Sequence, residues 1–249
     1  MKKILIFFLG GELLISYTYS QNVDHLGGGR FSKNIEYNLL WLEAGYNFNS
    51  KGEVEKLFFG DFNAPVEFFY APSFEGASGF RIVRDTLEKS YTLEIKFVSN
   101  FKEADEESSK KYPLAGISAD QMLSISKVVS DSIRDLNRNN MIKAHEKRNQ
   151  LFKIESRSFP ISDLFAEKLY KAMVSVIDNF KARGVPPFIS DGYSVTFRNV
   201  VEDEVWSLKI HMPTGSALKL SDFCRKVIEE TLATGNPDES SYIKLLDVF

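Results

Sequence analysis

The chain has 249 residues, of which 43% are hydrophobic and 26% charged, a composition typical of a globular protein. Lys and Arg number 31 and Asp and Glu 34, so the formal net charge is −3, which excludes a strongly basic nucleic-acid-binding protein. The single Cys excludes an intramolecular disulfide framework and any metal site built from several cysteines.

The first twenty residues have the parts of a secretory signal peptide. Two lysines open the chain, an apolar run follows at 4–9, and Thr18 and Ser20 supply small residues before a cut at Gln21. The run is shorter than the roughly 20 residues of a membrane-spanning helix. We therefore expect a signal peptide over 1–20, a periplasmic or secreted location, and no transmembrane segment in the mature chain. The alternative is a buried N-terminal strand or helix of a cytoplasmic protein, since Glu12 weakens the apolar core.

Residues 21–34 contain a glycine triplet and few apolar side chains, which indicates a flexible leader. The triplet lacks the Lys-Ser/Thr pattern that follows a phosphate-binding loop. From 35 to 115 the chain is predicted to be mostly antiparallel β structure. The expected strands are 37–42, 54–59, 66–70, 80–84 and 91–97. Apolar and polar side chains alternate in the last of these, as in a half-buried antiparallel strand. The charged residues 102–112 are expected to form a solvated surface loop.

Residues 116–249 are predicted to form a helix-rich α+β half, either separate or part of one domain with the preceding half. A first helix begins near Ser118, and apolar residues three or four apart form one stripe along it. These residues are Met122, Ile125, Val128, Val129, Ile133 and Leu136. The stripe fades near Arg138, and the polar stretch that follows is expected to be a solvated helix or loop.

Two further helices have clearer boundaries. Ser162 can cap the first of them, and Gly184 and the prolines after it end that helix. The other helix begins near Ser221 and ends by Gly235. Cys224 lies on its apolar face, so we expect this thiol to be buried. The last residues of the chain are expected to form a short segment docked on the body.

A C-terminal hairpin is the most strongly patterned element. Apolar and polar side chains alternate on both sides of a turn at 202–203. In the register that this turn sets, Val195 faces Ile210 and Phe197 faces Leu208. A shift by one residue would put Val195 opposite a polar side chain, so the alternation specifies the register.

Together these elements predict an α+β fold in which antiparallel strands form one or more sheets and three main helices pack on one face. The pattern of residues 79–97 also resembles that of residues 192–210. A duplicated hairpin-plus-helix unit would explain the similarity, and so would convergent amphipathic patterning.

The three histidines are the first candidates for chemistry. His25 and His145 lack the second His at i+4 that zinc hydrolases use. His211 is predicted to lie across the hairpin from Ser194, with Asp191 close in sequence, so a nucleophilic Ser–His–Asp site is one interpretation. The chain lacks the G-x-S-x-G motif, and an ordinary polar cross-strand pair is the interpretation that we favour. No catalytic residue, cofactor or metal site is predicted.

If any surface of the chain binds a partner, we expect it to be the outer face of the hairpin, although a simply solvated sheet face is the interpretation that we favour. It carries Thr196, Arg198, Lys209 and His211. A second indication of a binding surface comes from the 21 Phe residues, several of which are consecutive between 58 and 74. Neighbouring residues of a strand point to opposite faces. Either both faces of the sheet are covered, or some of these rings are exposed to a protein or glycan partner.

The C-terminal third combines an aspartate-glycine-aromatic strand at 191–193, a strand that contains Trp206, a turn after Met212 and a helix from Ser221. With the export signal that ends at Ser20, this pattern resembles uncharacterised secreted or periplasmic proteins of Bacteroides-type bacteria. The resemblance implies no activity and no functional residues.

The leading hypothesis is therefore an exported envelope protein that acts as a non-catalytic protein- or glycan-interaction module, without a nucleic-acid partner. One alternative is a hydrolase of envelope or dietary polymers whose carboxylates are brought together only by the fold. Another is an immunity-type inhibitor of a secreted toxin. The sequence leaves the enzyme question open and favours a non-enzymatic role.

Overall fold

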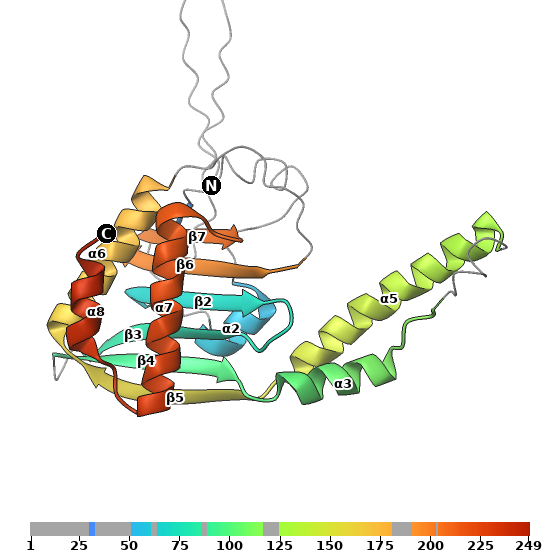
Figure 1. Ribbon diagram of the computed structural model, residues 1–249, viewed down its shortest axis with the longest axis horizontal. Helices are drawn as coiled ribbons and strands as arrows, with labels where there is room; N and C mark the ends of the chain where they lie inside the picture. Colours follow the sequence, from blue (N-terminus) through green and yellow to red (C-terminus); the bar gives the residue numbers. More distant parts are fainter. Residues whose placement is uncertain are drawn as a thin grey trace, which may run out of the picture.

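Seven strands form one mainly antiparallel sheet in the order β1-β7-β6-β2-β3-β4-β5 (Figure 1). Each neighbouring pair is antiparallel except β1 and β7, which are parallel. The computed structural model describes residues 30–32, 51–60, 64–85, 89–116, 125–180, 191–202 and 204–249. The strands are β1 (Arg30–Ser32), β2 (Val66–Pro72), β3 (Ser78–Asp85), β4 (Ser90–Val98), β5 (Ile154–Ile161), β6 (Tyr193–Val201) and β7 (Glu204–His211).

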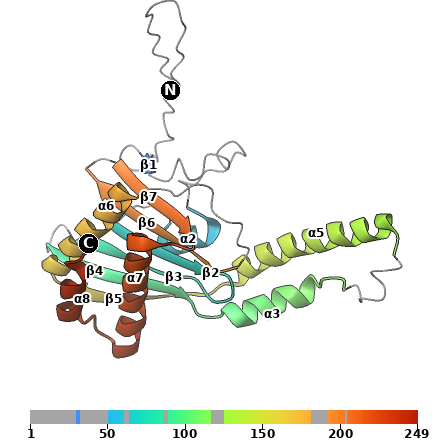
Figure 2. The same cartoon turned by 45° about the horizontal axis from the view of Figure 1, so that its top comes forward.

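Three helices cover one face of this sheet: α6 (Asp163–Asn179), α7 (Gly215–Thr234) and α8 (Glu239–Leu246) (Figures 1 and 2). They bury the main core against alternate side chains of the strands. The predicted α+β class is therefore confirmed. The backbone N–H of Phe165 donates to the Ser162 hydroxyl at 3.2 Å, which confirms the predicted helix cap.

The end of α7 and the burial of its cysteine are also confirmed. Gly235 ends the helix in the left-handed conformation, with φ of 79°. Cys224 is fully buried, and burial raises the pKa of its thiol. The helix begins at Gly215 rather than near Ser221, because the turn after β7 leads directly into it.

The opposite face of the sheet is covered in part by a short helix, α2 (Glu53–Phe59), which lies behind the sheet in Figure 1. Phe58 and Phe59 pack there against Phe69 and Val98 in a second, smaller core. The predicted strand over 54–59 is therefore wrong. A short apolar run can be a strand or a buried helix, and here the apolar side chains also recur at helical spacing.

A helical arm projects from the sheet between β4 and β5 (Figure 1). It consists of α3 (Phe101–Lys111) and α5 (Lys127–Leu151), and the 25 residues of α5 span about 37 Å. The predicted loop over 102–112 is in fact α3, and the helix expected near Ser118 lies in the arm rather than on the sheet. Its apolar stripe is not in the core, because Val128 is 76% exposed.

The two predicted halves of the chain share the sheet. Strand β2 pairs with β6, and β4 pairs with β5 along eight residues. Strand β5 was not predicted, because its central residues are polar and exposed. The strand expected at 37–42 and the signal peptide at 1–20 lie outside the described residues. None of the helices in the described part is long and apolar enough to cross a membrane.

The suspected internal repeat is reflected in two hairpins. Strands β3 and β4 are antiparallel neighbours, as are β6 and β7. The helices that follow differ in place: α3 belongs to the arm, whereas α7 packs on the sheet. A duplicated unit therefore stays a prediction.

Candidate functional site

The β6–β7 hairpin has the predicted register. Val195 pairs with Ile210 and Phe197 with Leu208, and all four side chains lie in the main core. The alternation of strand residues places the predicted binding row on the opposite face. That row consists of Thr196, Arg198, Lys209 and His211.

The structure corrects the expectation that this row is a solvated surface. Thr196 and Arg198 are only 3% and 2% exposed, and Lys209 and His211 are half-buried. Helix α2 was expected to be a strand, so a covering element over the hairpin was not foreseen. Arg198 therefore cannot contact a partner directly while its ion pair with Glu55 on α2 stays in place, and the buried Thr196 has almost no surface to offer a partner.

Arg198 belongs to a buried network of four charged side chains. Its Nη1 donates to Glu55 Oε1 on α2 at 2.5 Å and to Glu67 Oε2 on β2 at 3.1 Å. The Lys51 ammonium lies 3.2 Å from Glu67 Oε2, and the Ala64 backbone N–H donates to Glu67 Oε1 at 2.8 Å. The network therefore joins α2 to the centre of the sheet.

Burial and charge act in opposite directions on the two cations. Burial lowers the pKa of Lys51, with Arg198 acting in the same direction and Glu67 against it. Burial also disfavours the charged form of Arg198, but Glu55 and Glu67 outweigh it and raise the pKa of the guanidinium. Both carboxylates are occupied by cations, so the network anchors α2 rather than offering a free acid or base.

His211 and Ser194 form the expected cross-strand pair. The Ser194 hydroxyl lies 3.2 Å from His211 Nδ1. His211 Nε2 is buried and has no hydrogen-bond partner among the residues that the structure describes. Asp191 has no hydrogen bond to this histidine in the ranges that the structure describes. The geometry therefore shows a polar pair and no oriented Ser–His–Asp triad.

The Phe-rich region forms core on both sides of the sheet. Phe68 is fully buried in the main core, and Phe58, Phe59 and Phe69 are buried in the second core. Phe74 differs, since it is 74% exposed in the turn between β2 and β3. Covering both faces thus accounts for the consecutive aromatic residues, and they form no broad exposed patch in the described part.

The arm presents a surface that sequence reasoning missed. Asn137 Nδ2 donates to the carbonyl of Ala115 at 2.9 Å, and its Oδ1 accepts from the Ala115 N–H at 2.8 Å. Near the sheet, Arg148 binds Asp105 at 2.8 Å and lies over the ring of Phe101. These contacts hold the two helical segments together through polar groups, so the apolar side chains of α5 are left outside.

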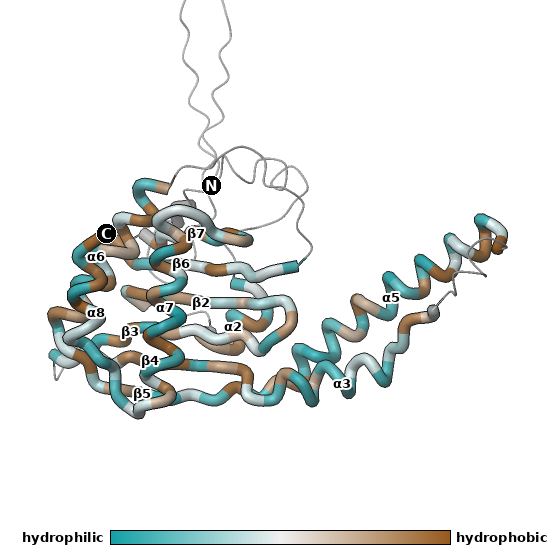
Figure 3. Tube along the Cα trace, viewed as in Figure 1, coloured by the Kyte–Doolittle hydropathy of each residue, from teal (hydrophilic) through white to brown (hydrophobic). Residues whose placement is uncertain are grey.

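Large apolar side chains are exposed at several positions along α5, where Figure 3 shows a mostly hydrophilic helix with separate hydrophobic positions. Each is 49% exposed or more. They are Val128, Val129, Leu136, Met141 and Ile142. Met141 and Ile142 lie in the polar stretch of the sequence, and their apolar side chains there were a signal of this surface. A solvated helix accounted for that stretch equally well.

A shallow groove of about 450 Å³ lies between α2 and the base of α5. Met141 and Ile142 form its apolar part, and Glu53, His145 and Glu146 its polar part. Partial burial, followed by the charge of Arg148, lowers the pKa of His145 against the raising effect of Glu53 and Glu146. The groove therefore combines apolar groups, an imidazole and two carboxyl side chains.

No protein-family model, no curated protein and no solved structure matches this chain. Within the described ranges, no three or more His, Cys, Asp or Glu side chains are grouped so that they could hold a metal ion. The function must therefore be inferred from the geometry and chemistry of the chain itself.

Proposed function

We propose that this chain is a non-catalytic interaction module of an exported envelope protein, and that the arm formed by α3 and α5 is its contact surface for a protein partner. The projecting arm with its exposed apolar side chains is the observation that carries the proposal. The charged start and short apolar run of residues 1–20 support export.

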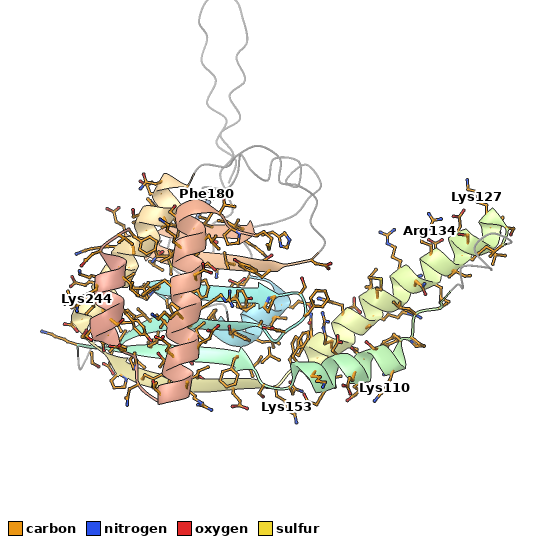
Figure 4. All side chains as sticks on the ribbon, in the orientation of Figure 1. Lys110, Lys127, Arg134, Lys153, Phe180 and Lys244 are labelled. Atoms are coloured by element: carbon orange, nitrogen blue, oxygen red, sulfur yellow. The ribbon has the colours of Figure 1, made fainter. Side chains whose placement is uncertain are left out.

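Helix α5 exposes several large apolar side chains that a partner could bury. Val128 is 76% exposed and Met141 60%. Burying such side chains in an interface contributes about 25 cal/mol for each Å² of apolar surface removed from water. Cationic side chains accompany them: Figure 4 shows Lys127 and Arg134 extending from the same helix. This mixture of apolar and Arg side chains is typical of protein interfaces.

The arm is also preorganised for contact. The bonds of Asn137 to Ala115 and of Arg148 to Asp105 hold the helices in place without a partner. A surface that is already ordered loses less conformational entropy on binding. The alternative of a glycan partner has less support, because the aromatic rings that would stack on sugars are mostly core.

The alternative of a hydrolase would need two carboxyl groups that face one cleft. The buried carboxylates in the described part are Glu55 and Glu67, and both bind Arg198. Neither is available as a general acid or nucleophile in this arrangement, so the interaction module is the function that the geometry supports best.

Site-specific photo-crosslinking tests the proposal. A photoreactive phenylalanine analogue replaces Leu136 or Ile142 on α5, each 49% exposed, and Leu245 on α8, 42% exposed, serves as the matched control. In an envelope extract we expect a crosslinked protein of defined mass from both arm positions and not from position 245. Equal crosslinking from position 245, or none from the arm, would contradict the proposal.

A further inference from the structure

Strand β5 forms a free edge of the sheet. It is the last strand in the order, and in Figures 1 and 2 no other strand lies beyond it. One side of its backbone bonds to β4 over Ile154–Ile161. Among the described residues, the other side makes no backbone hydrogen bond outside this ladder. Such an edge presents a row of N–H and C=O groups that can pair with a further strand.

The first five residues of β5 contain neither a bulge nor a proline, two of the features that block an edge. The strand pairs with β4 one residue to one residue along its whole length, so it contains no bulge. Pro160, which has no N–H, lies near the end and leaves 154–158 able to pair. Residues 155–158 are all exposed.

The charges on this edge are self-complementary. Glu155 and Arg157 flank Ser156 and lie on the same face of the sheet, since they are two residues apart. In an antiparallel pair with a twofold axis through Ser156, Glu155 faces Arg157 of the second copy, and Arg157 faces Glu155 of the second copy. Opposite charges directly across an antiparallel pair are favourable, whereas like charges are unfavourable.

We propose that β5 is a homodimerisation edge, on which a second copy of this chain adds its own β5 in antiparallel register about Ser156. The interface is isologous, so the same residues act on both sides. The two sheets become continuous, as in strand addition by peptides. The proposal is independent of the function assigned to the arm, because it uses none of the arm residues.

The dimer has a consequence for the arm. Each arm leaves the sheet beside the start of β5, where Figure 4 labels Lys153. The twofold axis places the two arms at opposite ends of the shared strand pair. A dimer therefore displays two contact surfaces, which raises the apparent affinity for a partner that offers two sites.

Charge reversal tests the register. Sedimentation equilibrium of the purified protein measures its dimer dissociation constant. The single variants Glu155→Arg and Arg157→Glu each bring like charges together, and we expect dimerisation to weaken roughly tenfold or more. The double variant Glu155→Arg/Arg157→Glu restores opposite charges and should dimerise about as well as the wild type. Lys171→Glu on α6, at a side chain 75% exposed, is the control for added charge.

Crosslinking provides a second readout of the same axis. In a Ser156→Cys variant the two introduced thiols meet across the twofold axis, so a short bis-maleimide should join two chains. Cys224 stays unreactive because it is fully buried. Three results would overturn the proposal. The wild type could be monomeric at every concentration, the double variant could dimerise as weakly as the single variants, or none of the three charge variants could change dimerisation.

Discussion

Replacing Arg198 with methionine removes the cation that joins Glu55 to Glu67 and keeps most of the length of the side chain. Arg198 contacts both carboxylates through one guanidinium nitrogen, at 2.5 and 3.1 Å. Arg198→Met therefore tests the electrostatic role of the network with little change in packing volume.

The expected magnitude follows from burial. Glu55 and Glu67 are 2% and 1% exposed, so water cannot replace the lost guanidinium. Lys51 still lies 3.2 Å from Glu67, but it cannot balance two carboxylates. Removing one partner of a buried ion pair typically costs about 3–5 kcal/mol. We expect the free energy of unfolding to fall by about that amount, and α2 to lose hydrogen-exchange protection first.

Urea denaturation followed by circular dichroism measures the free energy of unfolding. The control is Lys171→Met, because Lys171 pairs with Glu167 at 3.6 Å and is 75% exposed. Such exposed pairs contribute about 0–1 kcal/mol. A loss for Arg198→Met no larger than that of this control would refute the view that the network anchors α2.

Three further predictions concern the core, a helix cap and pH. Phe197→Ala should lower the free energy of unfolding by about 3–5 kcal/mol in urea denaturation, because Phe197 is fully buried. The control Phe74→Ala removes a ring that is 74% exposed and should lower it by less than about 0.5 kcal/mol. Ser162→Ala should raise exchange at the Phe165 amide and destabilise α6 by about 1 kcal/mol, and an unchanged amide would argue against the cap. The folded protein lowers the pKa of His145 below 6.5, the ordinary value that applies in the unfolded chain. The stability that the neutral imidazole contributes is therefore complete above pH 6.5 and is lost as the pH falls through the lower pKa of the folded state. The difference in unfolding free energy between wild type and His145→Gln should therefore shrink on acidification, and a difference that grows would contradict the sign.

The local periodicity of the sequence was sufficient to predict those elements whose apolar side chains contact neighbours close in sequence. The turn at 202–203 and the alternation in the C-terminal hairpin together determined the pairing of Val195 with Ile210, because a shift by one residue would bury polar groups. The end of α7 followed equally from Gly235, which can adopt a left-handed conformation without steric cost.

The same periodicity did not reveal which surface an apolar face would meet. The stripe that contains Val128 and Leu136 is typical of a core helix, yet both side chains are exposed on the arm. A helical period shows that one side of a helix differs from the other. Whether that side packs on the sheet, on α3 or on a separate molecule depends on where the whole chain places the helix.

The sequence by itself determined the α+β class, the hairpin register, the helix cap at Ser162 and the burial of Cys224, because each depends on residues a few positions apart. Only the tertiary structure decided the burial of Arg198, whose partners Glu67 and Glu55 lie 131 and 143 positions away. It also decided the projection of the arm and the free edge of β5. A charged side chain in a strand is solvated or buried according to what distant segments bring to it, and no local pattern carries that information.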